Sequence, residues 1–335
     1  MDFCHYGYLL NRSEVTKKIL ITGASGFVGA RLLERCVIDG LEVSTITRPG
    51  GRNIPDVAAH HVTRGFEFAD DLSDPLRGQD VVVHCAARVH VMNEHAINPL
   101  MEFRRINVAG TLDLAQQAAA AGVKRFIYLS SVKVNGEETF GGGRFTAKDT
   151  GRPMDAYAIS KDEAEIGLRS LGLLSGLEVV IIRPPLVYGA KVQGNFKTML
   201  SAVYRGIPLP FAAVHNKRSF VAVDNLVDLL LCCAVHPAAA NQTLMVSDDD
   251  DISTPELLRQ VGLFMGRPAR LFAAPKMLVR GVAALAGRSA AVSRLVGSLQ
   301  VDISDTRRLL NWTPVVTVKR GLSQAVEGYF VEKSM

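Results

Sequence analysis

The sequence has few of the features that would place it in a specialised class of protein. Its five cysteines are odd in number and follow neither a disulfide framework nor a zinc-binding spacing, so we expect a cytoplasmic protein without a metal site. The longest apolar stretch, 226–240, contains Asp228 and Pro237 and is too short to span a membrane. The net charge of +5 is spread along 335 residues rather than gathered in a basic stripe, which argues against nucleic-acid binding.

What the sequence does have is an alternation of strand-like and helix-like segments from Lys18 onward, which predicts an α/β fold with a doubly wound parallel sheet. We expect strands at 18–22, 42–47, 62–68, 80–84, 125–130 and 179–183, and helices at 27–39, 98–121 and 155–172. The alternation weakens after Gly189, and the acidic run 248–251 reads as a solvated turn. We therefore predict an N-terminal extension (1–17), a dinucleotide-binding domain (18–189) and a smaller, mainly substrate-binding lobe (190–335).

A glycine-rich turn, Thr22-Gly-Ala-Ser-Gly-Phe-Val-Gly29, lies between the first predicted strand and the first predicted helix. Gly23 permits a tight turn, Gly26 lets a pyrophosphate approach the backbone, and Gly29 permits close helix–sheet packing. The strand before the turn and the helix after it make this pattern a prediction of nucleotide binding by a Rossmann-type domain. The same turn supplies the other expected cofactor contacts, Ser25, Phe27 and Val28.

The end of the second predicted strand lacks the acidic residue that holds the ribose 2′-hydroxyl in NAD sites. The sequence there reads Thr47-Arg48, and Arg52 follows. Because a guanidinium pairs well with a 2′-phosphate, the two arginines favour NADP(H) as the cofactor, with NAD(H) as the alternative. The other interpretation is that both arginines are surface residues of a loop.

Further cofactor contacts are expected after the later strands. Asp71 and Leu72 either meet the adenine edge or cap a helix, and the two roles are compatible. The small side chains of 85–87 leave room for a ribose and a phosphate. Asn107 is included as a polar residue that braces a strand loop, so its role is chiefly structural. The residues of this set are Asp71, Leu72, Cys85, Ala86, Ala87, Asn107 and Pro184.

Tyr157 and Lys161 are four residues apart on a predicted helix, so their side chains share one face. We expect the ammonium of Lys161 to lie beside the Tyr157 phenol and to lower its pKa from about 10. A phenol tuned in this way is a general acid or base for a carbonyl or an alcohol. Together with the glycine-rich turn, the pair therefore indicates an enzyme.

Several motifs together resemble the extended short-chain dehydrogenase/reductase family, in its NAD-dependent epimerase/dehydratase branch that acts on nucleotide sugars. The resemblance covers about 18–330 and implies cofactor-dependent oxidation or reduction at C4 of a UDP-linked sugar. The segments that carry it are the glycine-rich turn, Asn107, Ser130-Ser131, the Tyr157/Lys161 pair, 183–189, 217–226 and 301–314.

The resemblance also implies roles for single residues. Ser131 would hydrogen-bond the reacting sugar oxygen, Tyr157 would transfer its proton, and Lys161 would lower the tyrosine pKa and hold the nicotinamide ribose.

The substrate-binding residues implied by the resemblance are less distinctive. Arg218 would bind the nucleotide diphosphate and Asn195 would lie near the sugar or the diphosphate. The ordinary alternatives are a surface ion pair for Arg218 and a helix cap for Asn195. Arg88 and Lys133 are expected near the sugar, with a loop role as the alternative for Arg88.

Departures from the family pattern narrow the reaction. Sugar-nucleotide dehydratases carry Thr-Asp-Glu where this chain has Ser131-Val132-Lys133, and valine cannot act as an acid or a base, so a dehydratase is rejected. Arg48 and Arg52, with the similarity of 88–94 and 297–302 to proteins of bacterial O-antigen clusters, favour an NADPH-dependent 4-reductase. It would reduce UDP-2-acetamido-2,6-dideoxy-hexos-4-ulose in surface-polysaccharide biosynthesis.

Two alternatives to the reductase remain open. One is an NAD-dependent 4-epimerase of UDP-hexose or UDP-N-acetylhexosamine. The other, less favoured because the Tyr157/Lys161 pair is present, is a non-catalytic NADP-binding regulator. Proteins of the resembling group often form homodimers through two long helices, which would correspond to 98–121 and 155–172.

Overall fold

The computed structural model describes residues 17–50, 57–89, 98–275 and 289–334, together with Met277 and Gly281. Almost all of the predicted N-terminal extension, and also Arg52, lie outside the described residues. The strands of the larger sheet are β1 (Ile19–Thr22), β2 (Val43–Thr47), β3 (Ala59–Val62), β4 (Val81–His84), β5 (Arg125–Leu129), β6 (Glu178–Arg183) and β9 (Thr243–Met245). A smaller sheet pairs β7 (Leu186–Tyr188) with β8 (Phe220–Ala222).

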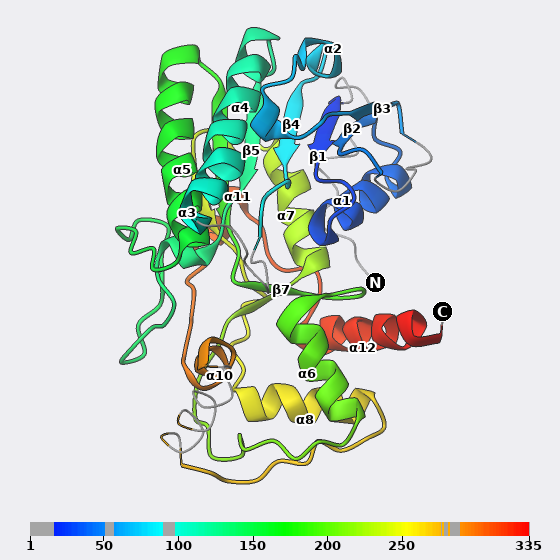
Figure 1. Ribbon diagram of the computed structural model, residues 1–335, viewed down its shortest axis with the longest axis vertical. Coiled ribbons are helices and arrows are strands. Elements are labelled where there is room, and N and C mark those ends of the chain that lie inside the picture. Colours follow the sequence, from blue (N-terminus) through cyan, green and yellow to red (C-terminus); the bar gives the residue numbers. More distant parts are fainter. Residues whose placement is uncertain are drawn as a thin grey trace.

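The larger sheet has seven parallel strands in the order β3-β2-β1-β4-β5-β6-β9 (Figure 1). Strands β2 and β3 lie on one side of β1, and β4 lies on the other side. The strand order therefore reverses between β1 and β4. Ligands of such sheets bind in the crevice at the carboxyl ends of the strands where this reversal occurs. The predicted doubly wound parallel α/β fold is confirmed.

Helices cover both faces of the larger sheet (Figure 1). One face carries α1 (Phe27–Ile38) and α7 (Val223–Val235), and the other carries α4 (Gly110–Ala120) and α5 (Ala156–Ser175). The predicted helix 98–121 is one continuous path made of three parts, with a π-helical segment between two α-helices. The remaining elements of this half are α2 (Ser73–Leu76), α3 (Pro99–Phe103), the π-helix η3 (Arg104–Ala109), α11 (Ser304–Leu310) and the 3₁₀ turns η2 (Phe66–Phe68), η4 (Val132–Val134) and η5 (Pro237–Ala239).

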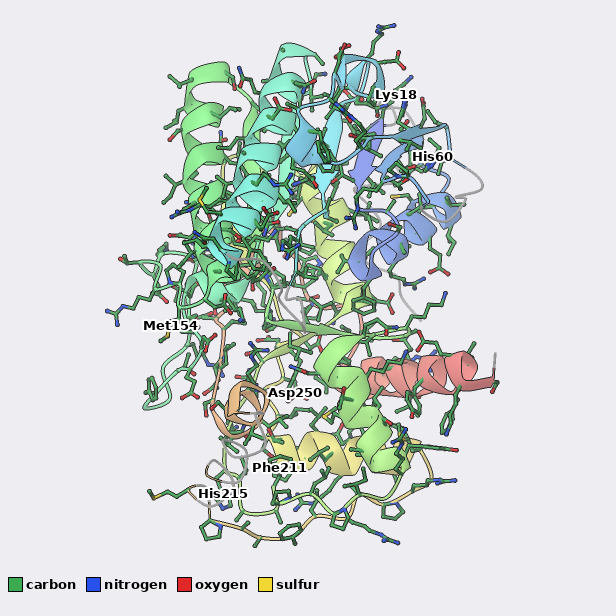
Figure 2. All side chains as sticks on the ribbon, in the orientation of Figure 1. Lys18, His60, Met154, Phe211, His215 and Asp250 are labelled. Carbon is green, nitrogen blue, oxygen red and sulfur yellow. The ribbon has the colours of Figure 1, made fainter. Side chains whose placement is uncertain are left out.

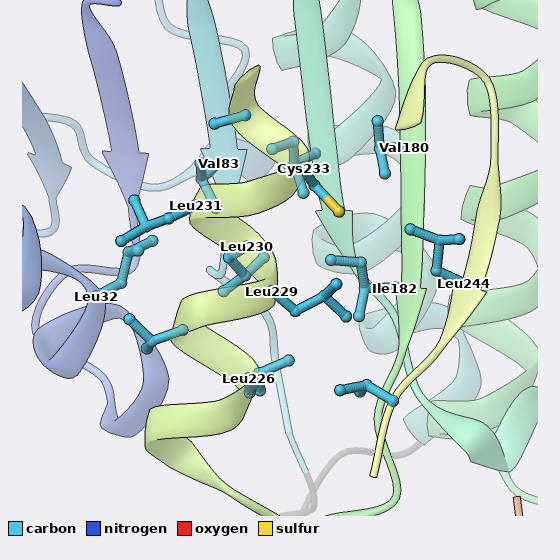
Figure 3. Packing of buried hydrophobic residues seen from close by; sticks show 14 of the residues in the cluster. Leu32, Val83, Val180, Ile182, Leu226, Leu229, Leu230, Leu231, Cys233 and Leu244 are labelled. Atoms are coloured by element: carbon cyan, nitrogen blue, oxygen red, sulfur yellow. The ribbon is translucent and has the colours of Figure 1, made fainter. Parts of the chain in front are cut away.

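The apolar face of α7 forms the centre of the largest core cluster (Figure 3). Leu226, Leu229 and Leu230 are fully buried on this helix. They pack toward the strands that carry Val180 and Ile182, because residues two apart in a strand point to the same face of the sheet. Burial of each leucine contributes on the order of 1.5–3 kcal/mol. This packing ties α7, a helix from the later half of the chain, firmly to the sheet.

A second group of helices gathers at one end of the molecule, at the bottom of Figure 1. It has its own buried cluster, to which Tyr188, Phe196, Phe211, Leu257 and Leu322 contribute. The helices are α6 (Gly194–Tyr204), α8 (Thr254–Phe264), α10 (Ser289–Val296) and α12 (Val318–Ser334). Between α6 and α8 the chain returns to the larger sheet through α7 and β9. The division of the chain near residue 190 stays a prediction.

Two predicted local structures are wrong. Residues 62–68 are not a strand, because β3 ends at Val62 and the chain then turns into the 3₁₀ segment η2. Gly65 has a φ of 142°, which ends the extended backbone. The carboxylate of Asp70 holds the turn by accepting hydrogen bonds from the Thr63 hydroxyl at 2.7 Å and the Arg64 amide at 2.9 Å.

The acidic run 248–251 is not a solvated turn throughout, because Asp248 is only 7% exposed. Its carboxylate accepts hydrogen bonds of 2.7 Å from the Tyr188 hydroxyl, the Ala222 amide and the Asn225 side chain. Burial raises its pKa to about 6. Asp250, labelled in Figure 2, does face solvent as predicted. Within the described ranges no group of acidic, histidine or cysteine side chains is arranged to hold a metal, and no helix is long and apolar enough to cross a membrane.

Candidate active site

The glycine-rich turn is packed so closely that side chains would not fit at two of its glycines. Gly23 has a φ of 72°, and a Cβ there would stand 2.7 Å from the amide nitrogen of Ala86. A Cβ at Gly29 would stand 2.2 Å from the carbonyl oxygen of Gly23. Ser25 and Gly26 are exposed, and the start of α1 has no side-chain cap, so its first amides are free to meet an anion. This geometry fits the dinucleotide that the sequence implies.

The crevice beside this turn is built from the ends of β1 and β4. Cys85, Ala86 and Ala87 follow β4 and are partly exposed beside the turn, as predicted. Beneath them the buried ring of His84 bridges two hydroxyls, with Nδ1 2.7 Å from Thr22 and Nε2 3.0 Å from Thr111. Burial, with a contribution from the charge of Lys161, lowers the pKa of His84 to about 3. We did not predict this brace, because a histidine within an apolar strand gives no signal of its partners.

Asn107 has the bracing role that the sequence favours. It lies on the π-helix η3, and its side chain accepts a hydrogen bond from the Arg88 amide at 2.8 Å. Its amide group donates to the Arg88 carbonyl and to the Ser160 hydroxyl, both at 3.0 Å. These bonds hold the loop after β4 against α5. Arg88 is held through its backbone, and its guanidinium lies 5.4 Å from the centre of the Phe103 ring.

The predicted adenine contacts are occupied by other partners. The Asp71 carboxylate accepts a hydrogen bond of 2.9 Å from the Ser73 amide, the first of α2, although the cap of this helix is Leu72 and not Asp71. The Leu72 amide donates to the Gln117 side chain at 2.8 Å. Arg48 is exposed directly after β2. Whether these residues contact a cofactor stays a prediction.

The three predicted catalytic residues come from neighbouring elements. Ser131 follows β5 and caps the 3₁₀ turn η4, where its hydroxyl accepts a hydrogen bond of 3.2 Å from the Lys133 amide. Tyr157 and Lys161 lie in the first two turns of α5, and Tyr157 lines the same cavity as Ser131. Pro184 lies close by, because its carbonyl accepts a hydrogen bond of 2.9 Å from the Val132 amide. The fold therefore brings the serine, the tyrosine and the lysine together.

The expected effect of Lys161 on Tyr157 is wrong for this structure. The ammonium of Lys161 donates to the Leu129 carbonyl at 2.8 Å and lies 4.5 Å from the centre of the Tyr128 ring, but 5.9 Å from that of Tyr157. Burial lowers the pKa of Lys161 to about 7, which weakens its positive charge near neutral pH. Burial raises the pKa of Tyr157 to about 12, the charge of Asp155 adds to the rise, and the Ser131 hydroxyl opposes it.

A cavity of about 700 Å³ opens beside Ser131 and Tyr157. The predicted substrate residues Lys133, Asn195 and Arg218 line it, whereas Arg88 is not among the lining residues of the described chain. Most of the remaining wall is apolar and comes from the second group of helices and its loops, including Phe211, which is labelled in Figure 2. The cavity thus joins the sheet half of the molecule to the lower half.

Two guanidinium groups stand in this cavity. Arg218 is 7% exposed and donates to the Gly297 carbonyl at 3.0 Å, and burial lowers its pKa to about 10, which keeps it charged at neutral pH. Arg294 reaches the same cavity from α10. Arg294 was not predicted, because only the packing of α10 brings it to the cavity. Two cations at one cavity suit a diphosphate.

Lys133 is held by acidic residues. Its ammonium bonds to the Asp155 carboxylate and lies 3.4 Å from Oε1 of Glu137. Asn195 lines the cavity from the first turn of α6 but is not the cap of that helix, which begins after Gln193.

The sequence of this chain matches one family over most of its length. Residues 19–246 fit the NAD dependent epimerase/dehydratase family, and the chain belongs to this family. The resemblance seen in the motifs is confirmed, and the chain is an NAD-dependent enzyme of the extended short-chain dehydrogenase/reductase type.

Individual relatives match most of the chain. A UDP-glucose 4-epimerase of Vibrio cholerae is 42% identical over 326 residues, 94% of this chain and 96% of that protein. An N-acetyl-alpha-D-glucosaminyl-diphospho-ditrans,octacis-undecaprenol 4-epimerase of Escherichia coli O157:H7 is 28% identical over 245 residues, 72% of this chain and 71% of that protein.

Solved structures share the fold. A UDP-glucose 4-epimerase of Thermotoga maritima with UDP-glucose matches with a TM-score of 0.76 at 20% identity, over 95% of this chain and 100% of that one. The Bordetella bronchiseptica enzyme WbmG in complex with NAD matches with a TM-score of 0.74 at 21% identity, over 96% of each chain.

Proposed function

We propose that this protein is an NAD-dependent 4-epimerase of a UDP-linked hexose or N-acetylhexosamine. The observation that carries the proposal is that Ser131 and Tyr157, with Lys161 one turn further along α5, line a cavity together with Arg218 and Arg294, although Lys161 itself is not among its lining residues. The 42% identity to a UDP-glucose 4-epimerase supports an epimerase over the reductase that the sequence motifs favoured.

In this mechanism the chain binds the sugar nucleotide and moves one proton. Arg218 and Arg294 hold the diphosphate, and Ser131 and Tyr157, which line the same cavity, receive the sugar. The glycine-rich turn would hold the dinucleotide, which would supply the hydride acceptor and then the hydride donor for C4, and inversion requires that the hydride return to the opposite face of the sugar. Tyr157 removes the proton of the C4 hydroxyl as the carbonyl forms and gives it back as the hydroxyl forms again. Ser131 hydrogen-bonds the same oxygen and keeps the Tyr157 hydroxyl aligned.

The exclusion of a dehydratase reaction has a structural argument as well. Elimination needs an acid and a base at the positions of Val132 and Lys133. Val132 has no titratable group, and Lys133 is engaged by Asp155 and Glu137. The arrangement therefore supports chemistry at C4 alone.

The second candidate is the NADPH-dependent 4-reductase of a UDP-linked 4-keto-6-deoxy-N-acetylhexosamine in surface-polysaccharide synthesis. It is favoured by Arg48, which is exposed directly after β2 where an NAD site has a carboxylate. Ser131 and Tyr157 would serve this reaction too, with Tyr157 as the acid.

One pair of assays separates the candidates. The purified protein is incubated with UDP-glucose and with UDP-N-acetylglucosamine, and the 4-epimers are measured by chromatography. It is incubated in parallel with the UDP-linked 4-keto sugar and NADPH. Interconversion without net change in cofactor supports the epimerase. Stoichiometric oxidation of NADPH with no interconversion would replace it by the reductase, and inertness in both assays, with the cofactor bound, would reject both.

A homodimer is the partner that we propose besides the UDP-sugar. The helices expected to form it, α4 and α5, pack side by side. On α5, Ile166, Leu173 and Leu174 are 56%, 88% and 90% exposed, which is unusual for a helix that faces only water. Light scattering after gel filtration tests this, and a monomeric mass at micromolar concentration would reject it. The cytoplasmic location stays a prediction.

A further inference from the structure

Lys133 has a different set of contacts from the one expected of a sugar-binding residue. Its ammonium has three donors, and two of them point at the carboxylates of Asp155 and Glu137. The Lys133 side chain is 22% exposed, so solvent only partly screens these bonds. Lys133 lines the cavity, but two of its three N–H donors are directed to carboxylates of the protein itself.

Asp155 links this lysine to the catalytic helix. It is the N-cap of α5, and its Oδ1 accepts a hydrogen bond of 2.8 Å from the Ala158 amide. Its other oxygen, Oδ2, accepts a hydrogen bond from the ammonium of Lys133. Tyr157 lies in the turn that this cap begins. A single carboxylate therefore fixes the first turn of α5 and ties that turn to η4.

These contacts connect Ser131 to Tyr157 through η4 and the start of α5. The Ser131 hydroxyl accepts a hydrogen bond from the Lys133 amide, the Lys133 ammonium bonds to Asp155, and Asp155 caps the turn that carries Tyr157. Ser131 and Tyr157 both line the cavity. Within the part of the chain that the structure describes, no other ion pair joins η4 to the start of α5. We propose that Lys133 is a positioning residue, which acts through Asp155 to hold Tyr157 against Ser131 and to offset a negative charge beside the reacting phenol. The inference rests on the proposed role of Tyr157 in proton transfer.

The charged groups around the Tyr157 phenol determine whether the loss of Lys133 raises or lowers its pKa. Tyr157 faces Asp155 from its own helix, Lys161 from the next turn, and Tyr128 from β5. Burial raises the pKa of Asp155, but its bonds to Lys133 and to the Ala158 amide outweigh burial, and Arg294 adds to the lowering. Asp155 is therefore ionised at neutral pH.

Removal of Lys133 would leave that carboxylate uncompensated. A less screened negative charge disfavours phenolate, so the pKa of Tyr157 would rise further. Each unit of rise leaves about tenfold less phenolate at a fixed lower pH. Removal of the charge of Asp155 would have the opposite effect on the phenol.

The experiment uses the cofactor-bound enzyme and the variants Lys133→Met, Asp155→Asn and the double variant. Asparagine at 155 keeps an oxygen for the cap while it removes the charge. The first readout is the pH profile of kcat/KM. The second is the phenolate absorbance of Tyr157 as a function of pH, taken as the difference between each protein and the same protein with Tyr157→Phe. This second readout does not depend on which sugar is the substrate.

We expect Lys133→Met to shift both the pH profile of kcat/KM and the phenolate titration curve of Tyr157 to higher pH. It should lower kcat more than it changes KM. We expect Asp155→Asn to move both curves to lower pH, and Lys133→Met to have a smaller effect when Asp155 is already replaced. Lys133→Arg should restore most of the profile. Lys148→Met is the matched control, since Lys148 lies 2.7 Å from Asp305 in an exposed pair elsewhere, and it should move neither curve.

Two outcomes would overturn the inference. In one, Lys133→Met raises KM and leaves kcat and both curves unchanged, which would make Lys133 a direct substrate contact. In the other, the variants lose thermal stability while the phenolate curve stays in place, which would make the ion pair purely structural. If the phenolate curve moves as expected but no C4 activity is found, the proposed function fails and the role of Lys133 stands.

Discussion

The buried carboxylate of Glu165 offers the sharpest test of how this active site is held together. Glu165 lies on α5, one turn after Lys161, and none of its surface is exposed. It accepts hydrogen bonds from the Ser130 hydroxyl at 2.5 Å and from Arg183 at 2.9 and 2.6 Å. Arg169 adds a further bond of 2.6 Å. Because Ser130 precedes Ser131, this cluster anchors the catalytic serine to the helix of the catalytic tyrosine.

Replacement of Glu165 by leucine should cost about 3–5 kcal/mol of the free energy of unfolding. The reason is that Arg183, only 4% exposed, would be left as a buried charge without its carboxylate. Glu163→Leu is the matched control, because Glu163 is on the same helix and pairs with Arg104, but in a pair whose side chains are 31% and 45% exposed. Exposed pairs contribute about 0.2–1 kcal/mol.

The assay is urea unfolding followed by the fluorescence of Trp312, the single tryptophan, which is 1% exposed and bonded to Asp228. Linear extrapolation of each transition gives the free energy of unfolding in water. The double variant Glu165→Leu/Arg183→Met should lose less than the sum of the two single variants, because it removes both buried charges together. A cost for Glu165→Leu no larger than that for Glu163→Leu would refute the reasoning.

Three further predictions concern the chemistry of the site. Tyr157→Phe should lower kcat by about 10²-fold or more in whichever C4 reaction is found, as typical of a lost general acid or base, and a near-normal rate would reject the mechanism. Arg48→Asp should weaken NADP relative to NAD by about tenfold to a hundredfold if a charge-assisted bond to the 2′-phosphate is lost, and an unchanged ratio of dissociation constants would show that Arg48 does not read that phosphate. His84 has a folded-state pKa of about 3, below its usual 6.5, so the unfolded chain binds the additional proton between these values. Its contribution to stability is therefore complete above pH 6.5 and is lost as the pH falls toward 3. His84→Gln should flatten the pH dependence of urea unfolding in that window, and an equally steep dependence would contradict the assignment.

Much of the fold could be predicted because its signals are local. The glycines at 23, 26 and 29 are required by contacts within a few residues or with the adjacent strand, and their spacing is visible in the sequence. The apolar runs that become β1 and β4 are buried on both faces, as parallel strands must be. The predictions were wrong where a side chain outside the predicted element determines the path of the backbone. The strand expected at 62–68 ends early because Asp70 turns the chain.

The candidate site could be predicted only in part for the same reason. The serine, tyrosine and lysine are found by spacing, and Arg218 by its motif. Arg294 enters the cavity through the packing of α10, and nothing in its immediate sequence distinguishes it from a solvated arginine. Glu165 is one of several acidic residues on α5, and only the arrival of Arg183 from β6 marks it as buried.

The spacing of Tyr157 and Lys161 shows most clearly which properties of the site the sequence alone does not determine. The four-residue spacing correctly puts both side chains on one face of α5, yet the expected lowering of the tyrosine pKa does not follow from it. The ammonium of Lys161 donates to the Leu129 carbonyl and lies over the Tyr128 ring, and after burial it is the charge of Asp155 that raises the pKa of the phenol. The protein therefore holds Tyr157 as a neutral hydroxyl in the cavity that Ser131 also lines. Because a shared face fixes proximity but not the balance of burial and charge, the state of the phenol depends on residues such as Lys133 that come from another element of the fold.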